Sequence, residues 1–259
     1  NEAWRCLKPG APLVIAGYKN EGAKTYIEKI TTLMGCEKQI EKNGASYSSI
    51  IYKQATYDPT KRIDDSDYTH LRPIAENTDL TLQSKPGLFG WNKIDAGSAL
   101  LIEQIAKGAL GDLHPRSALD LGCGYGYLSL AAARLSACQH IQRWILTDNN
   151  AAALTAAKEN LQANGIVGEV LAADAGKKLG KKVDLLLCNP PFHQGFSVDG
   201  DLTDKFLKSA QQLLTPEGLA LFVVNQFIPL ERKAVGLFKE ISLIANNGSF
   251  KVIRLSNKG

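Results

Sequence analysis

The feature that most constrains the fold is a glycine-rich run at residues 117–129, SALDLGCGYGYLS. Apolar residues surround Asp120 in its first part, and apolar residues recur at helical spacing in its last part. Between them, Gly122, Gly124 and Gly126 permit a tight turn and a close approach of the backbone to a ligand. The run therefore predicts a buried strand, a turn and a helix, in a parallel α/β sheet that binds ligands at the carboxyl ends of its strands.

The glycine spacing argues against a dinucleotide site. The dinucleotide fingerprint requires a glycine at position 127, and this chain has Tyr127 there, which disfavours a nicotinamide-dependent oxidoreductase. Residues 145–148 then read as a second strand that ends in Asp148. Its carboxylate is placed to accept hydrogen bonds from two ribose hydroxyls. The alternative is a strand-to-helix turn that binds no ligand.

A second run, LLLCNPPFHQG at residues 185–195, predicts a buried strand with a polar tip. The amine of a planar base is a poor nucleophile because its lone pair is delocalised into the ring, so an enzyme must hold its hydrogens and direct the lone pair. The side-chain carbonyl of Asn189 and the backbone carbonyl of Pro190 are suitable acceptors. Phe192 offers a flat face on which an extruded base can stack. The two runs together predict methyl transfer from S-adenosylmethionine to a base nitrogen, and the alternative for this tip is a plain turn.

A third predicted strand, residues 169–172, is followed by Asp174, where a carboxylate would meet the adenine amino group of the cofactor. A surface turn before Gly176 is the competing interpretation. Asp120 is expected near the methionine end. The predicted contacts of S-adenosylmethionine are Asp120, Gly122, Gly124, Gly126, Asp148, Asp174 and Asn189.

Residues 86–98, PGLFGWNKIDAGS, directly precede the glycine-rich strand and a predicted helix at 99–106. The segment can form a lid over the cofactor, with Phe89 and Trp91 as apolar walls and Asp95 or Ser98 as polar contacts. The alternative is a capped helix start with its aromatic side chains in the core.

Composition sets the remaining limits. A chain of 259 residues with 44% hydrophobic content is long enough for one large globular domain or two smaller ones. The net charge of +4 permits an RNA partner without requiring one. No apolar run reaches the length of a membrane span and no secretory signal is visible, so we expect a cytoplasmic protein.

Two sets of side chains have both a structural and a functional interpretation. The five scattered cysteines contain no C-x-x-C pair and no histidine at metal-ligand spacing, which predicts reduced thiols and no metal site. Cys123 and Cys188 lie close enough to the two motifs to raise a catalytic thiol as the alternative. The lysine cluster at residues 177–182 is either a solvated loop or a contact for RNA phosphates.

The two ends of the chain share one plan. Residues 7–52 and 214–255 each predict a turn with proline and glycine, a strand, a helix, an Asn-Gly hairpin and a strand, with the second helix expected around 231–238. This similarity predicts an internal duplication. We assign residues 1–57 to a truncated, degenerate methyltransferase-like domain, 58–85 to a connector, and 86–259 to a catalytic methyltransferase domain.

The runs SALDLGCGYGYLSLAAARLS, ANGIVGEV, NPPFHQG and GSFKVIRL resemble the ribosomal RNA guanine-N2 methyltransferases. The resemblance covers residues 86–255 firmly and the first fifty residues loosely, and GLFGWNKIDAGSALL matches the segment that this family carries before its glycine loop. It implies a Rossmann-like class I methyltransferase fold, a mostly parallel sheet with helices on both faces, preceded by the C-terminal part of a second, degenerate domain of the same kind.

The resemblance also implies a monomeric, cytoplasmic enzyme that methylates the N2 amine of one guanine in 16S ribosomal RNA, as naked RNA or in the 30S subunit. Asn189, Pro190 and Phe192 would then hold the guanine. The large-subunit enzyme of the family is similar, and adenine-N6 and protein-glutamine methyltransferases share the Asn-Pro-Pro-Phe signature. A 23S RNA, an adenine or a glutamine therefore remains open as the substrate, as does a non-catalytic RNA-binding or assembly module.

Overall fold

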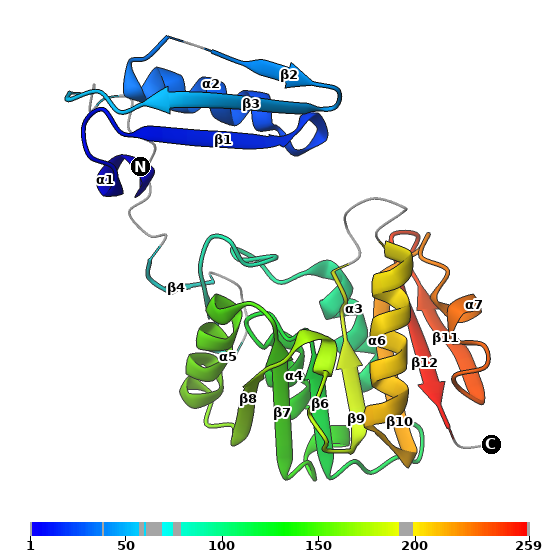
Figure 1. The fold of residues 1–259 in the computed structure, drawn as a ribbon. Coiled ribbons are helices and arrows are strands. Elements are labelled where there is room, and N and C mark those ends of the chain that lie inside the picture. The colour runs from blue at the N-terminus through cyan, green and yellow to red at the C-terminus, as the bar shows by residue number, and fades with distance from the viewer. Residues whose placement is uncertain are drawn as a thin grey trace. The chain divides into compact units, whose positions relative to one another are not determined.

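The computed structural model describes residues 2–37, 39–56, 60, 69–74, 79–191 and 199–257 (Figure 1). The chain divides into two compact units, Asn1–Ser66 and Asp67–Gly259. The division falls within residues 58–85, the segment predicted as a connector. The proposed domain limits themselves stay a prediction.

The first unit is a three-stranded antiparallel sheet with one long helix against it (Figure 1). Its elements are α1 (Glu2–Cys6), β1 (Pro12–Tyr18), η1 (Lys19–Glu21), α2 (Ala23–Met34), β2 (Glu41–Asn43) and β3 (Ser46–Tyr52). The strand order is β1–β3–β2. α2 buries Ile27, Leu33 and Met34, and Gly35 caps its C-terminus with a left-handed backbone (φ 63°).

The second unit is built on a seven-stranded sheet with the order β11–β12–β10–β9–β6–β7–β8. Its strands are β6 (Ser117–Leu121), β7 (Arg143–Asp148), β8 (Gly168–Ala172), β9 (Val183–Cys188), β10 (Leu214–Asn225), β11 (Glu240–Asn246) and β12 (Phe250–Ser256). Neighbouring strands from β10 to β8 run parallel, whereas β12 is antiparallel to both of its neighbours. The predicted mostly parallel, Rossmann-like sheet is confirmed.

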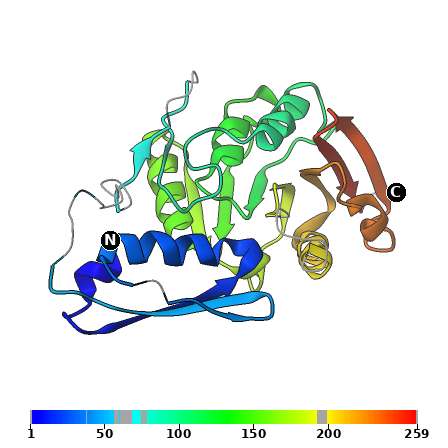
Figure 2. The same ribbon diagram turned by 90° about the horizontal axis from the view of Figure 1, so that it is seen from above.

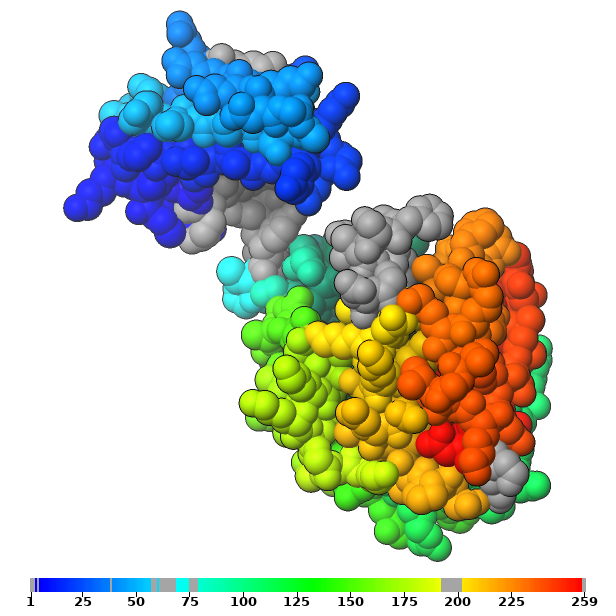
Figure 3. All heavy atoms as spheres, turned by 45° about the vertical axis from the view of Figure 1, so that its right-hand side comes forward, coloured from blue at the N-terminus to red at the C-terminus, as the bar shows by residue number. Residues whose placement is uncertain are grey.

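Helices lie on both faces of this sheet (Figure 2). They are α3 (Ala96–Ala106), α4 (Tyr127–Ala133), η3 (Ser136–Cys138), α5 (Ala151–Ala163), η4 (Asp174–Gly176), α6 (Asp199–Leu213) and α7 (Leu230–Ala234). On β9, Leu185 and Leu187 join the core formed with α3, α4 and α5, and Leu186 and Cys188 join the core formed with α6 and α7. Burial on two faces explains why the strands read as continuous apolar runs. Figure 3 shows the gold atoms of α6 beside the orange atoms of the α7 region.

The shared plan of the two chain ends extends to their topology. In the first unit the order is β1–β3–β2, and in the second unit the corresponding strands have the order β10–β12–β11, with antiparallel pairing in both. This agreement supports the predicted duplication.

The helix expected at 231–238 was predicted too long: α7 ends at Ala234, because Gly236 takes a left-handed backbone (φ 82°) and Val235 bridges to Phe238.

Part of the segment predicted as a connector packs on the second unit. β4 (Arg72–Pro73) pairs with β5 (Gln83–Ser84), and the Asn160 side chain of α5 both donates to and accepts from the backbone of Gln83, at 2.8 Å each. The Arg72 guanidinium lies 4.4 Å from the centroid of the Trp91 ring. Trp91 is therefore partly buried against the hydrophobic core. This agrees with the alternative interpretation of residues 86–98, a capped helix start with its aromatic side chains in the core.

Candidate active site

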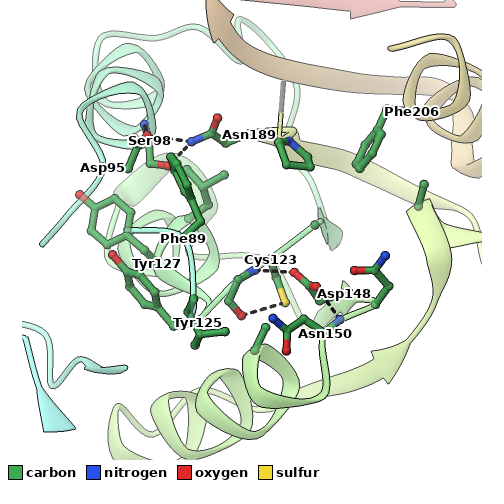
Figure 4. Close-up of a pocket in the computed structure, with 18 of the residues that line it drawn as sticks. Phe89, Asp95, Ser98, Cys123, Tyr125, Tyr127, Asp148, Asn150, Asn189 and Phe206 are labelled. Carbon is green, nitrogen blue, oxygen red and sulfur yellow. Dashed lines mark hydrogen bonds between the residues drawn. The ribbon is translucent and has the colours of Figure 1, made fainter. Parts of the chain in front are cut away.

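A cavity of about 360 Å³ opens where the carboxyl ends of β6, β7, β8 and β9 meet (Figure 4). It is lined by the loops that follow these strands, by the segment before α3 and by one side of α6. This is the location predicted from the parallel sheet, because the ends of parallel strands gather at one edge.

The glycine loop forms the floor of the cavity. Gly122 and Gly124 line it with left-handed backbones (φ 79° and 54°). Gly126 (φ 91°) has a different place, since a Cβ there would lie 3.2 Å from Leu146 and 3.6 Å from Ala157. Gly126 thus lets α4 pack closely against β7 and α5, and its predicted cofactor contact stays a prediction.

Asp148 ties the glycine loop to the next strand. Its Oδ2 accepts the backbone N–H of Gly124 and its Oδ1 accepts that of Asn150, each at 2.9 Å (Figure 4). A carboxylate oxygen can accept a second hydrogen bond, so the same group retains capacity for two hydroxyl donors in the cavity. Asp148 lines the cavity at the end of β7, where the sequence predicted it; its contact with a ribose stays a prediction.

Asp120 lies beneath the glycine loop. It is fully buried, it does not line the cavity, and its Oδ2 accepts from the backbone N–H (3.1 Å) and the hydroxyl (2.9 Å) of Ser129 at the start of α4. Among the residues that the structure describes, Oδ1 has no hydrogen-bond partner. Asp120 therefore joins the end of β6 to the start of α4 beneath the glycine loop, and its predicted place near the methionine end of the cofactor stays a prediction.

The burial of Asp120 predicts a pH-dependent stability. Desolvation, partly offset by the Ser129 bonds, raises the pKa of its carboxyl from 3.8 to about 7. Between these values the folded chain keeps a proton that the unfolded chain has lost, so the contribution of Asp120 to stability falls as the pH rises and is constant above about 7. We expect the free energy of unfolding, relative to Asp120→Asn, to fall by on the order of 3 kcal/mol from pH 4 to pH 7. Urea unfolding of both proteins across this range checks it; parallel curves would contradict it.

Asn189 follows β9 and is anchored from another element. Its Nδ2 donates to Asp95 Oδ2 and to Ser98 Oγ, at 2.8 Å each (Figure 4). Asp95 is also the N-cap of α3, because the same Oδ2 accepts the backbone N–H of Ser98 at 2.8 Å. The side chain of Pro190 is buried, and Pro191 lines the cavity beside Asn189. Phe192, the predicted stacking platform, lies outside the described residues.

Asp174 follows β8 and lines the cavity, in agreement with its predicted position. Its carboxylate forms an ion pair with Lys205 of α6 at 2.5 Å, and more than half of the Asp174 side chain is exposed. Its predicted contact with an adenine amino group stays a prediction, and a ligand there would share this carboxylate with Lys205.

The sequence reasoning missed the contribution of α6. Phe206 is 5% exposed and lines the cavity, and a Cβ on Gly122 would lie 3.5 Å from its ring. The signal was the amphipathic pattern of residues 199–213, which predicts a helix but does not say which side chains reach the strand ends. Phe89, by contrast, was predicted as a lid wall, and it lines the cavity with 58% of its side chain exposed.

The thiols near the site are not activated. Burial, followed by the charge of Asp120, raises the pKa values of Cys123 and Cys188 well above their ordinary range. Cys188 Sγ donates to the carbonyl of Leu121 at 3.1 Å. Because the thiolate is the nucleophilic form, these groups support the structural interpretation. Within the described part of the chain, no cluster of His, Cys, Asp and Glu is able to hold a metal ion, and no helix is long and apolar enough to cross a membrane.

The lysine cluster lies on the loop between β8 and β9. Lys181 forms an ion pair with Glu169 at 2.7 Å, with both side chains about half exposed. Arg143 donates to the carbonyl of Lys182 at 2.8 Å. These exposed contacts are typical of a solvated loop, one of the two interpretations of the cluster. Its contact with RNA phosphates stays a prediction.

The comparisons with known proteins agree with this geometry. The model of the methyltransferase small domain family matches residues 79–254. The chain is 29% identical over 251 residues to the ribosomal RNA small subunit methyltransferase C of Chromohalobacter salexigens. This alignment covers 95% of this chain and 70% of the relative. The protein of the same name from Escherichia coli strain SMS-3-5 is 35% identical over 175 residues, 68% of this chain and 49% of the relative.

A solved structure resembles nearly the whole chain. It is the Thermus thermophilus 16S rRNA N2 methyltransferase RsmC in complex with AdoMet and guanosine, with a TM-score of 0.80 and 26% identity. The match covers 99% of this chain and 67% of that protein.

Proposed function

The chain belongs to the methyltransferase small domain family, and we propose that it transfers a methyl group from S-adenosylmethionine to the exocyclic N2 amine of a guanine in 16S ribosomal RNA. The observation that carries the proposal is the amide of Asn189, which Asp95 and Ser98 hold in the lining of the cavity that the glycine loop also lines. The relatives named for the small-subunit enzyme, and the similar fold that holds AdoMet and guanosine, supply the substrate class.

The residues present fit the cofactor. The cavity of about 360 Å³ lies within the range of small-molecule sites, about 300–1,000 Å³. Asp148 offers acceptors for the ribose hydroxyls, and the left-handed backbones of Gly122 and Gly124 keep the floor free of side chains. Asp174 is proposed to accept from the adenine amino group, and the ring of Phe206 gives that end of the cavity an apolar wall.

Catalysis in this proposal depends on holding the amine. When bound, S-adenosylmethionine supplies a methyl group on a positively charged sulfur. Oδ1 of Asn189 accepts one hydrogen of the guanine amine and the backbone carbonyl of Pro190 accepts the other, so the nitrogen lone pair is directed into the cavity. Orientation and proximity then supply most of the rate enhancement. Phe192 is proposed as the surface on which the guanine stacks.

The partner in this proposal is 16S ribosomal RNA or the 30S subunit, and the protein acts on it as a monomer in the cytoplasm. The net charge of +4 suits an RNA substrate. The first unit is proposed to be the degenerate domain of the duplication and to contribute RNA contacts alone.

A tritiated-methyl transfer assay tests the function. The protein and labelled S-adenosylmethionine are incubated separately with unmodified 30S subunits, 50S subunits, naked ribosomal RNA and a protein extract, and labelled RNA is digested to nucleosides. We expect the label as N2-methylguanosine in 16S RNA. Label in 23S RNA, in adenosine or in protein would overturn the substrate, and absence of label from every fraction would overturn the activity.

A further inference from the structure

The amide of Asn189 is held in one orientation by residues that lie more than ninety positions away in the chain. Both hydrogens of its Nδ2 are engaged, one by Asp95 Oδ2 and one by Ser98 Oγ. An amide NH₂ group has two hydrogens, so this nitrogen has none left to offer a substrate. The atom of the amide that remains for a ligand in the cavity is Oδ1, which can only accept.

Asp95 is the group that selects this orientation. A carboxylate accepts hydrogen bonds and does not donate them. In a flipped amide, Oδ1 of Asn189 would face Asp95 Oδ2, and two acceptors form no hydrogen bond. The Ser98 hydroxyl does not discriminate, because it can donate as well as accept. A flipped amide would also present its NH₂ group to the amine of a base, and two donors form no hydrogen bond.

Asp95 is itself fixed by the start of α3. Its Oδ2 accepts the backbone N–H of Ser98, the hydrogen bond of a helix N-cap. α3 packs against β10 and β12, and its first turn lies flush on Phe250: a Cβ on Gly97 would lie 2.9 Å from that ring and 3.1 Å from Asp95 Oδ2. The sheet therefore sets the position of the helix start, and the helix start sets the position of the carboxylate.

From this geometry we infer that Asp95 is a positioning residue for methyl transfer, which holds the Asn189 amide so that Oδ1 accepts from the target amine. The inference rests on the proposed function for its substrate. It differs from a lid contact with the cofactor, the role expected from the sequence, because Asp95 acts through Asn189.

Two substitutions separate positioning from capping. Asp95→Ser keeps a good N-cap, since serine and aspartate cap about equally well, but its shorter side chain does not reach Nδ2 of Asn189. Asp95→Asn keeps both the length and an oxygen for the cap, and that oxygen can still accept from Asn189. We expect Asp95→Ser to lower kcat by about 10- to 100-fold with little change in the Kd of S-adenosylmethionine, and Asp95→Asn to recover most of the loss.

A second readout is independent of activity. The side-chain NH₂ signals of Asn189 in ¹⁵N-labelled protein are assigned by their absence from Asn189→Ala, and their hydrogen exchange is measured in the absence of RNA. We expect protected signals in the wild-type protein and in Asp95→Asn, and fast exchange in Asp95→Ser. Unprotected wild-type signals would overturn the inference whether or not any variant folds.

The two readouts also distinguish the failure of the inference from that of the function. An active wild-type enzyme whose Asp95→Ser variant keeps its kcat would overturn the inference and leave the function intact. A loss of kcat that Asp95→Asn does not recover would likewise overturn it. Wild-type protein that methylates no guanine, with protected Asn189 signals, would overturn the function and, with it, the assigned purpose of this geometry.

Discussion

Replacement of Asn189 by alanine is expected to lower kcat for methyl transfer by about 10²- to 10³-fold, the usual cost of losing one preorganised hydrogen-bonding group at a reacting centre. The amine of guanine would lose the acceptor that orients its lone pair, and the hydrogen-bond acceptors of Asp95 and Ser98 would lose their shared donor. Single-turnover methylation of 16S RNA measures the effect. The Kd of S-adenosylmethionine should change little, because the glycine loop and Asp148 are untouched.

Two comparisons make this result specific. Gln142→Ala changes an exposed carboxamide directly before β7, at the sheet edge opposite the cavity, and should leave the rate unchanged. Calorimetric titration of S-adenosylmethionine into Asn189→Ala should show that the cofactor still binds. A variant with undiminished turnover would exclude the assigned role, and a variant with lost cofactor binding would assign Asn189 to the cofactor rather than to the base.

The parts of the site that could be predicted from sequence are those in which the functional residue and the strand or turn that positions it lie in the same short segment. The glycine loop follows its strand directly, and Asp148 and Asn189 each stand at the end of an apolar run. The parallel sheet then brings these strand ends together. A pattern of a dozen residues contains both the backbone conformation and the functional group, so reading it locally is sufficient.

The parts that could not be predicted depend on distances across the fold. Phe206 of α6 lines the cavity and Lys205 of the same helix pairs with Asp174, and only the packing of that helix on the sheet determines which of its side chains do so. Asp95 was read as a lid contact because the sequence does not show that the start of α3 lies beside the end of β9. The complete burial of Asp120 could not be read from the sequence either, because it depends on elements that cover β6 from both sides.

Replacement of Asp148 by alanine is expected to weaken the binding of S-adenosylmethionine by at least about 100-fold. Hydrogen bonds to a charged group contribute about 1.5–3 kcal/mol each, and the proposed ribose contact uses two. The substitution also frees the backbone N–H groups of Gly124 and Asn150, which the carboxylate now holds at 2.9 Å, so the loop loses part of its preorganisation. Titration calorimetry measures the Kd directly.

The matched control is Glu169→Ala, which removes another carboxylate from the neighbouring strand, where it pairs with Lys181 on the surface. Its Kd should equal that of the wild-type protein, since a surface ion pair contributes little and lies outside the cavity. Asp148→Asn divides the two roles of the carboxylate, because an amide oxygen can still accept one backbone N–H but presents no charge to the ribose. We expect it to bind the cofactor more tightly than Asp148→Ala and more weakly than the wild type. Equal affinity in all four proteins would mean that the ribose is held by other groups, and that Asp148 only ties the glycine loop to the sheet.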